Sequence, residues 1–136
     1  MENLKKKGVI VMLADKPVVP TLPAVDLERA KKFYQEKIGL GPPISSSESD
    51  VTFECGQGTK LYLYQRDKTK ADHTVFSFLV DDVEQEVKEL KDKGVSFESF
   101  DMPGAKMVDN IFSWENKKAA WFKDSEGNII GISHID

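Results

Sequence analysis

The sequence predicts an α+β fold of two similar modules, each with a strand, a helix and then about three further strands. Two segments carry this prediction, Val25–Gly39 and Val80–Gly94, which have the same length and the same plan. In each, a valine and an aspartate precede an amphipathic helix pattern, and a glycine able to adopt a left-handed conformation ends it. The segments match at their ends rather than residue by residue. We interpret them as an internal duplication with a period of about 55 residues.

The spacing of apolar residues predicts which face of each helix is buried. Residues three and four positions apart lie on the same side of a helix. At the start of the second helix, the carboxylate of Asp81 or Asp82 can accept hydrogen bonds from the free backbone N–H groups. The predicted buried residues are Leu27, Ala30, Tyr34 and Ile38 in the first helix, and Val83, Val87 and Leu90 in the second.

Short apolar runs between turn-forming residues predict the strands. Module one spans about residues 17–66, and its predicted strands are Pro17–Val25, Val51–Cys55 and Lys60–Gln65. Module two spans about residues 73–134. Its first predicted strand runs from His73 or Thr74 to Val80, and the others are Val95–Phe100, Ala119–Lys123 and Ile129–Ser133. The prolines of the first strand favour an edge position. The stretch Asp101–Asn116 is expected to be a long irregular loop, and such loops often cover binding sites.

Composition excludes several classes of function. The 136 residues fit one domain, and a net charge of −4 without a basic stripe argues against a nucleic-acid partner. The single Cys55 excludes an internal disulfide and fits a reducing, cytoplasmic location. No apolar stretch is long enough to cross a membrane. Residues 1–16 resemble a signal peptide, but their apolar run is short and no cleavage site follows it. We therefore expect an N-terminal extension that could add an edge strand.

The duplicated β-α-β-β-β plan resembles the vicinal-oxygen-chelate superfamily, which contains glyoxalases, extradiol dioxygenases and bleomycin-resistance proteins. The resemblance covers about residues 17–133. It implies two curved mixed sheets around a cavity, helices on the outside, and a homodimer whose clefts are built from both chains. The residues that carry it are Asp26–Ala30, Phe33–Tyr34, Gly39–Leu40, Val80–Asp82, Gly94–Val95 and the closing run Ala120–Asn128.

The resemblance also implies four positions at which metal-dependent members hold a divalent ion. In this sequence those positions carry Val19, Tyr62, Val75 and Gly131, and none offers an imidazole or a carboxylate. The neighbouring residues are no better. His73 would share a strand face with Val75 but has no partner ligand, and His134 should point away. The sequence therefore predicts neither a metal nor another cofactor.

Aromatic residues are the candidates for a binding site. Strand alternation places Tyr62 and Tyr64 on one face of their strand and Leu61 and Leu63 on the other, under a helix. Tyrosine rings suit a half-polar pocket wall, although the aromatic residues could instead be core or dimer contacts. Trp121 or Phe122, with Phe112 and Trp114 from the long loop, could close the pocket. The predicted ligand-binding residues are Tyr62, Tyr64, Ser77, Trp114, Trp121 and Phe122.

Two function classes remain. The first is a metal-free protein that binds a flat or cationic small molecule, as drug-sequestering members of the bleomycin-resistance branch do. The second is a glyoxalase-like enzyme, a lyase, isomerase or dioxygenase, with a metal site displaced from the expected positions or with a tyrosine as acid–base catalyst. The aromatic candidates and the acidic net charge favour the first class.

Overall fold

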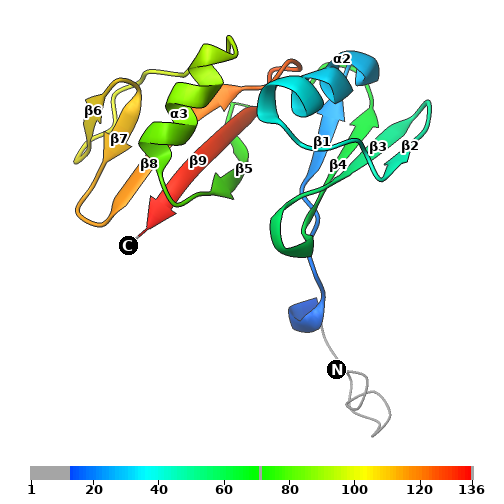
Figure 1. Ribbon diagram of the computed structural model, residues 1–136, viewed down its shortest axis with the longest axis horizontal. Helices are drawn as coiled ribbons and strands as arrows, with labels where there is room; N and C mark the ends of the chain where they lie inside the picture. Colours follow the sequence, from blue (N-terminus) through cyan, green and yellow to red (C-terminus); the bar gives the residue numbers. More distant parts are fainter. Residues whose placement is uncertain (1–12, 71, 136) are drawn as a thin grey trace, which may run out of the picture.

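Two β-sheets form the body of the described chain, and each has a helix packed against it (Figure 1). The computed structural model describes residues 13–70 and 72–135. Sheet one has the strand order β1-β4-β3-β2, in which β1 and β4 are parallel and the other pairs are antiparallel. Its strands are β1 (Thr21–Ala24), β2 (Ser45–Ser46), β3 (Asp50–Glu54) and β4 (Lys60–Gln65).

Sheet two repeats this topology with one additional strand. Its order is β5-β9-β8-β7-β6, and its first and last strands in the chain, β5 and β9, are again parallel neighbours. The strands are β5 (Thr74–Leu79), β6 (Lys106–Val108), β7 (Ile111–Ser113), β8 (Lys117–Lys123) and β9 (Ile129–Ile135). The predicted α+β class with two mixed sheets is therefore confirmed.

The two main helices begin at aspartate caps. Helix α2 (Leu27–Lys32) continues into a π-helical segment, η2 (Phe33–Ile38), and α3 covers Val83–Asp92. The Asp26 carboxylate accepts from the backbone N–H of Arg29 at 3.0 Å, and the Asp82 carboxylate accepts from that of Gln85 at 3.1 Å. Asp82, rather than Asp81, is thus the cap of α3. Single 3₁₀ turns lie at Leu13–Asp15 (η1) and Gly56–Gly58 (η3).

The core lies between the sheets and their helices and includes residues of both modules. In β4, Leu61 and Leu63 are buried, whereas Tyr62 and Tyr64 on the opposite face are partly exposed, as the alternation predicted. Six of the seven predicted helix residues are buried, and Ile38 packs partly buried against them. The buried six are Leu27, Ala30, Tyr34, Val83, Val87 and Leu90.

The region between α3 and β8 differs from the prediction. Val95–Phe100 is not a regular strand, because it makes only a single bridge to β8, through Phe97. The following stretch, Asp101–Asn116, contains the β6–β7 hairpin rather than a wholly irregular loop. Asp109 and Asn110 form the turn of this hairpin with φ angles of 54° and 69°. Two successive positive φ angles match the right-handed twist of paired strands, and aspartate and asparagine tolerate them well.

The predicted first strand is shorter than expected. The strand begins at Thr21 rather than Pro17, and β1 is an edge strand of sheet one. Residues 13–20, which precede β1, extend away from both sheets (Figure 1). Most of the predicted 1–16 extension lies outside the described residues, so the edge strand expected there is not tested. No helix in the described chain is long and apolar enough to cross a membrane.

Candidate functional site

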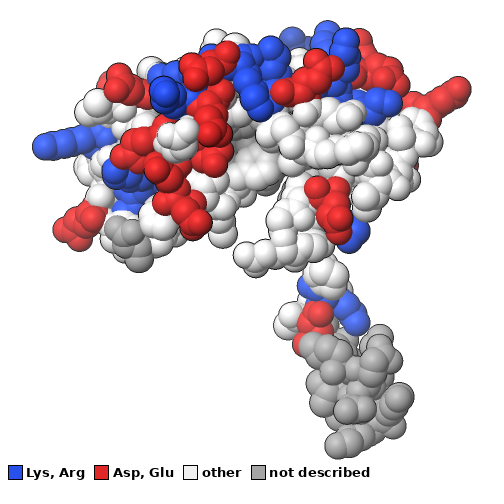
Figure 2. All heavy atoms as spheres, viewed as in Figure 1, with Lys and Arg blue, Asp and Glu red and all other residues white. Residues whose placement is uncertain are grey.

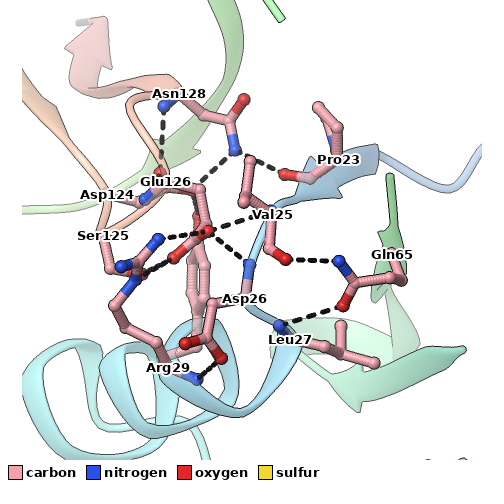
Figure 3. A network of polar contacts seen from close by, with 11 residues as sticks. Pro23, Val25, Asp26, Leu27, Arg29, Gln65, Asp124, Ser125, Glu126 and Asn128 are labelled. Carbon is pink, nitrogen blue, oxygen red and sulfur yellow. Dashed lines mark hydrogen bonds and ion pairs between the residues drawn. The ribbon is translucent and has the colours of Figure 1, made fainter. Parts of the chain in front are cut away.

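A network of polar contacts joins the two modules at the turn between β8 and β9 (Figure 3). Glu126 Oε1 accepts from the backbone N–H groups of Val25 and Asp26, both at 3.0 Å, where α2 begins. Arg29 donates to the same carboxylate through Nε at 2.7 Å and Nη2 at 3.0 Å. The Glu126 side chain is only 1% exposed. We call this network the clasp.

The clasp continues through the other residues of the turn. Asp124 accepts from the Tyr34 hydroxyl at 2.6 Å and from the backbone N–H of Asn128 at 2.9 Å. The Asn128 side chain donates to the Pro23 carbonyl at 3.1 Å. Burial, followed by the charge and hydrogen bond of Asp124, raises the pKa of Tyr34 well above its ordinary value, so this phenol stays a donor. The closing turn of module two is therefore fixed to the first strand and helix of module one.

Electrostatics hold Glu126 in its charged form. Burial of the carboxylate raises its pKa, but the hydrogen bonds from Arg29, Asp26 and Ser125 and the charge of Arg29 outweigh burial. The pKa of Glu126 is consequently lowered to about 2. Because this ionised group serves as a structural acceptor between modules, it is not available as a general base.

The face of each sheet that points away from its helix is here called the open face. In β8, alternation puts Trp121 on the open face of sheet two and Phe122 on the helix face. Phe122 is 0% exposed and packs against Phe33 and Phe97. The prediction that Phe122 lines the ligand pocket is therefore wrong, because its ring belongs to the core. Of the two neighbours that could have closed the pocket, Trp121 has the suitable position.

An aromatic cluster covers part of the open face of sheet two. Phe112 lies at its centre, 5.0 Å from Phe100, 5.4 Å from Trp121 and 6.5 Å from Trp114, measured between ring centroids. The Lys117 ammonium lies 5.6 Å from the centre of the Trp114 ring, within range of a cation–π contact. Phe112 is buried, whereas Phe100 is 41% exposed. The structure thus brings Trp114 and Trp121 into one cluster, and Phe100 forms its accessible edge.

A cavity of about 450 Å³ opens beside Phe100 and Trp121. This volume is in the range of small-molecule sites. Apolar side chains supply part of its wall, while Glu98 and Lys123, 3.8 Å apart, supply an ion pair at its border. Its lining residues are Asp72, His73, Thr74, Glu98, Phe100, Met102, Trp121, Lys123, Gly127 and Ile129. Charged side chains of both signs lie over the helices α2 and α3 on the face of the molecule shown in Figure 2.

Phe100 and Met102 were not among the predicted site residues. They reach the cavity because the chain crosses the end of β8, where the backbone N–H of Glu98 donates to the Trp121 carbonyl at 2.7 Å. The only sequence signal was the aromatic residue itself, at the border between a predicted strand and a predicted loop.

Ser77 and Trp121 meet over Gly131 on the same open face. Ser77 and Gly131 are register partners in the parallel pair β5–β9, and Trp121 is the partner of Gly131 on β8. A side chain at position 131 would overlap the Ser77 hydroxyl and lie 3.2 Å from Trp121 Nε1. Glycine is therefore needed here for close approach rather than for a turn. Two predicted site residues, Ser77 and Trp121, are brought together in this way.

Tyr62 and Tyr64 lie on sheet one, apart from this cavity. Their rings stack with centroids 6.4 Å apart and planes 14° apart. The Tyr62 hydroxyl donates to Asp50 at 2.8 Å, and this hydrogen bond, with lesser effects of burial and charge, raises the pKa of Tyr62. Neither tyrosine is among the residues that line the cavity beside Trp121. Within one chain, the structure does not join the tyrosine pair to the tryptophan site.

The described side chains do not provide the group of ligands that a divalent metal ion needs. Among residues 13–70 and 72–135, no three His, Cys, Asp or Glu side chains gather where they could hold a metal. His73 lies at the cavity border, 4.0 Å from Asp72, and both side chains are largely exposed. His134 Nδ1 lies 2.8 Å from the Val80 carbonyl. At position 131 a protein ligand would first have to displace Ser77. We therefore derive no chemistry through a metal.

Comparison with known proteins identifies the family that has this architecture. Residues 16–132 match the model of the glyoxalase/bleomycin resistance protein/dioxygenase superfamily. The chain belongs to this superfamily. The resemblance inferred from the duplicated helices and the closing run is thereby confirmed, although membership does not specify a reaction or a ligand. Among curated proteins, no sequence matches the chain closely enough to count as a relative.

Similar solved structures include an antibiotic binding protein and an enzyme. An integron cassette protein from the Halifax Harbour sewage outfall metagenome is 20% identical, with a TM-score of 0.68 over 89% of this chain and 99% of that one. TnmS3, an antibiotic binding protein from a Streptomyces species, is 21% identical, with a TM-score of 0.67 over 93% and 100%. Lactoylglutathione lyase from Agrobacterium tumefaciens is 19% identical, with a TM-score of 0.64 over 88% and 93%. At these identities the similarity shows the fold alone.

Proposed function

We propose that this glyoxalase/bleomycin-resistance superfamily member is a metal-free small-molecule binding protein. Its ligand lies on the open face of sheet two, in the cavity beside Phe100 and Trp121. The observation that carries the proposal is the combination of accessible aromatic rings with a cavity of about 450 Å³. Phe100 is 5.4 Å from Trp121 between ring centroids, so a flat apolar ligand can contact both.

The donor set supports binding rather than metal-assisted chemistry. The four positions taken from the family pattern carry Val19, Tyr62, Val75 and Gly131, which offer neither imidazole nor carboxylate. The likeness to the antibiotic binding protein TnmS3 is consistent with a role in sequestering a drug, although it is a likeness of fold. A cytoplasmic location remains part of the proposal and rests on the lone Cys55.

We further place the binding protein in a homodimer. β5 is an edge strand of sheet two, and Leu79 near its end is 82% exposed on the open face. Ile135 on the neighbouring strand and Val18 and Val19 before β1 are also exposed apolar residues. Exposed apolar side chains along an unpaired strand favour contact with another chain. In a dimer, Tyr62 and Tyr64 of one chain could complete the tryptophan site of the other.

The alternative is a glyoxalase-like lyase, isomerase or dioxygenase. A tyrosine acid–base mechanism would need a phenol that gives up its proton readily, but the hydrogen bond to Asp50 raises the pKa of Tyr62. Glu126, the most strongly perturbed carboxylate of the clasp, is fully engaged in module contacts. No observation in the described chain favours the enzyme over the binding protein.

A ligand titration with matched variants tests the proposal. Indane, a small flat hydrocarbon, should change the NMR signal of the Trp121 indole N–H and quench tryptophan fluorescence. Replacing Phe100 by Ala should weaken indane binding about threefold to tenfold, because one aromatic contact contributes about 0.5–1.5 kcal/mol. Ile44→Ala, which removes an exposed apolar side chain outside the cavity, serves as the control.

Two results would overturn the proposal. One is the absence of binding by indane and by its amine, ketone and carboxylate derivatives. The other is binding that Phe100→Ala leaves unchanged. Sedimentation velocity at micromolar concentration should give the mass of a dimer, and a monomer alone would remove the dimeric form of the site while leaving the cavity beside Trp121 in place.

A further inference from the structure

One carboxylate of the cavity beside Trp121 accepts no hydrogen bond within residues 13–70 and 72–135. It belongs to Glu98, whose side chain is 32% exposed and whose charged partner there is Lys123, with Nζ 3.8 Å from Glu98 Oε1. That separation is longer than the roughly 2.7–3.2 Å of a direct hydrogen bond. Because the Lys123 side chain is 54% exposed, water screens the pair and it contributes little to stability. The Glu98 carboxylate can therefore accept from a donor on another molecule.

Aromatic rings lie in the same cavity as this carboxylate. Phe100, Trp121 and Glu98 all line it, and the two rings are 5.4 Å apart between centroids. Trp121 and Lys123 are two residues apart on β8 and so share its open face. The segment that carries Glu98 and Phe100 crosses β8 at the hydrogen bond between the Glu98 N–H and the Trp121 carbonyl. A ligand in contact with the rings consequently lies beside the Glu98 carboxylate.

The charges around the cavity favour a cation. The lining contains two carboxylates, those of Asp72 and Glu98, but only one ammonium group, that of Lys123. His73, counted as neutral, adds no charge. The faces of aromatic rings attract cations, and a hydrogen bond from a protonated amine to a carboxylate is stronger than one between neutral groups. An anion would instead meet an unfavourable net charge.

We propose that the cavity beside Trp121 binds a flat aromatic ligand that carries a protonated amine, and that the Glu98 carboxylate holds this amine. The ligand's ammonium group takes the place of Lys123 Nζ next to Glu98, and Lys123 turns into the solvent to which it is already exposed. This inference rests on the proposed function and adds the charged group that its ligand carries. Glu98 is then the residue that determines specificity within the site.

A matched series of probes tests the inference: indane, 1-indanone, 1-aminoindane and indane-1-carboxylate. They share one flat body and differ in the polar group. At pH 7 the protonated amine should bind about tenfold more tightly than indane, as expected for a hydrogen bond to a charged group that is partly open to solvent. The ketone should resemble indane, and the carboxylate should bind more weakly than the amine. Quenching of tryptophan fluorescence measures all four affinities.

Two variants of the ion pair should act in opposite directions. Glu98→Gln should abolish the preference for the amine and leave indane binding unchanged, because it removes the charge but keeps the size of the side chain. Lys123→Gln should strengthen amine binding about twofold to threefold, since it removes the competing ammonium group. Glu36→Gln on η2 and Lys60→Gln on β4 change the net charge by the same amounts outside the cavity. These two controls should leave the preference for the amine unchanged.

Four results would overturn the inference while indane binding that Phe100→Ala weakens still supports the proposed function. They are equal binding of amine and indane, tighter binding of the carboxylate than of the amine, an amine preference that survives in Glu98→Gln, and amine binding that Lys123→Gln weakens. If none of the four probes binds, the proposed function fails with it.

Discussion

Neighbouring residues of β4 allow a comparison between the core and the open face. Leu63 is buried under the helix of module one, whereas Tyr64 lies on the opposite face, stacked on Tyr62. Leu63→Ala should lower the free energy of unfolding by about 2–5 kcal/mol, because it leaves a cavity in the core. Tyr64→Ala should lower it less, since its ring is only partly enclosed. Chemical denaturation measures both, and equal losses would show that Tyr64 is a core residue.

At the scale of an element, the β6–β7 hairpin supports the segment that carries Phe100. Asn110 donates to Ser99 Oγ at 2.7 Å and to the Glu98 carbonyl at 3.3 Å, and accepts from Lys91 at 2.9 Å. Its φ angle is 69°, which glycine adopts without strain. Asn110→Gly should therefore keep the turn but remove the side-chain contacts, so amide hydrogen exchange around residues 98–100 should accelerate.

Two further variants separate turn strain from the lost contacts. Asn110→Ala should destabilise the protein by about 1–2 kcal/mol more than Asn110→Gly, because alanine is strained at positive φ. Asn116→Gly, in the next loop, is the matched control and should leave exchange at residues 98–100 unchanged. Exchange that stays slow in Asn110→Gly would mean that the aromatic cluster alone fixes Phe100.

The same hairpin shows where sequence reasoning reached its limit. Helix boundaries could be predicted because aspartate caps and terminal glycines act locally, and Asp26, Asp82, Gly39 and Gly94 all occupy those positions. The hairpin was missed although Asp109–Asn110 between apolar residues is a turn signal. Its two strands are only three residues each, so the sequence pattern predicts one long loop instead.

For the whole molecule, sequence reasoning gave the architecture and part of the candidate site. The alternation of side chains along a strand correctly placed Tyr62 and Tyr64 on the face of β4 opposite its leucines. Applied to β8, the same alternation places Phe122 in the core once Trp121 is assigned to the open face. Phe100 could not be predicted in the same way, because its position depends on how an irregular segment crosses the end of β8. Glycine inside β9 was a usable signal of close approach.

The clasp holds the two modules together, and the stability that it contributes depends on pH through the ionisation of Glu126. The folded-state pKa of Glu126 is about 2, below the ordinary 4.5, so the carboxylate stabilises the folded protein fully above about pH 4.5. That contribution is lost as the pH falls from 4.5 towards 2. Glu126→Gln should therefore lower the free energy of unfolding at pH 7 by about 1–3 kcal/mol, because the charged acceptor for Arg29 is removed.

The difference between the wild type and Glu126→Gln should shrink as the pH falls, since protonation of Glu126 also removes its charge. Denaturation at pH values from 7 down to 3 measures this difference, and Glu36→Gln, an exposed carboxylate variant on η2, is the control. Equal stability of the two proteins across this range would show that the charge of Glu126 does not hold the modules together. The backbone hydrogen bonds at Val25 and Asp26, which a glutamine can still accept, would then be sufficient.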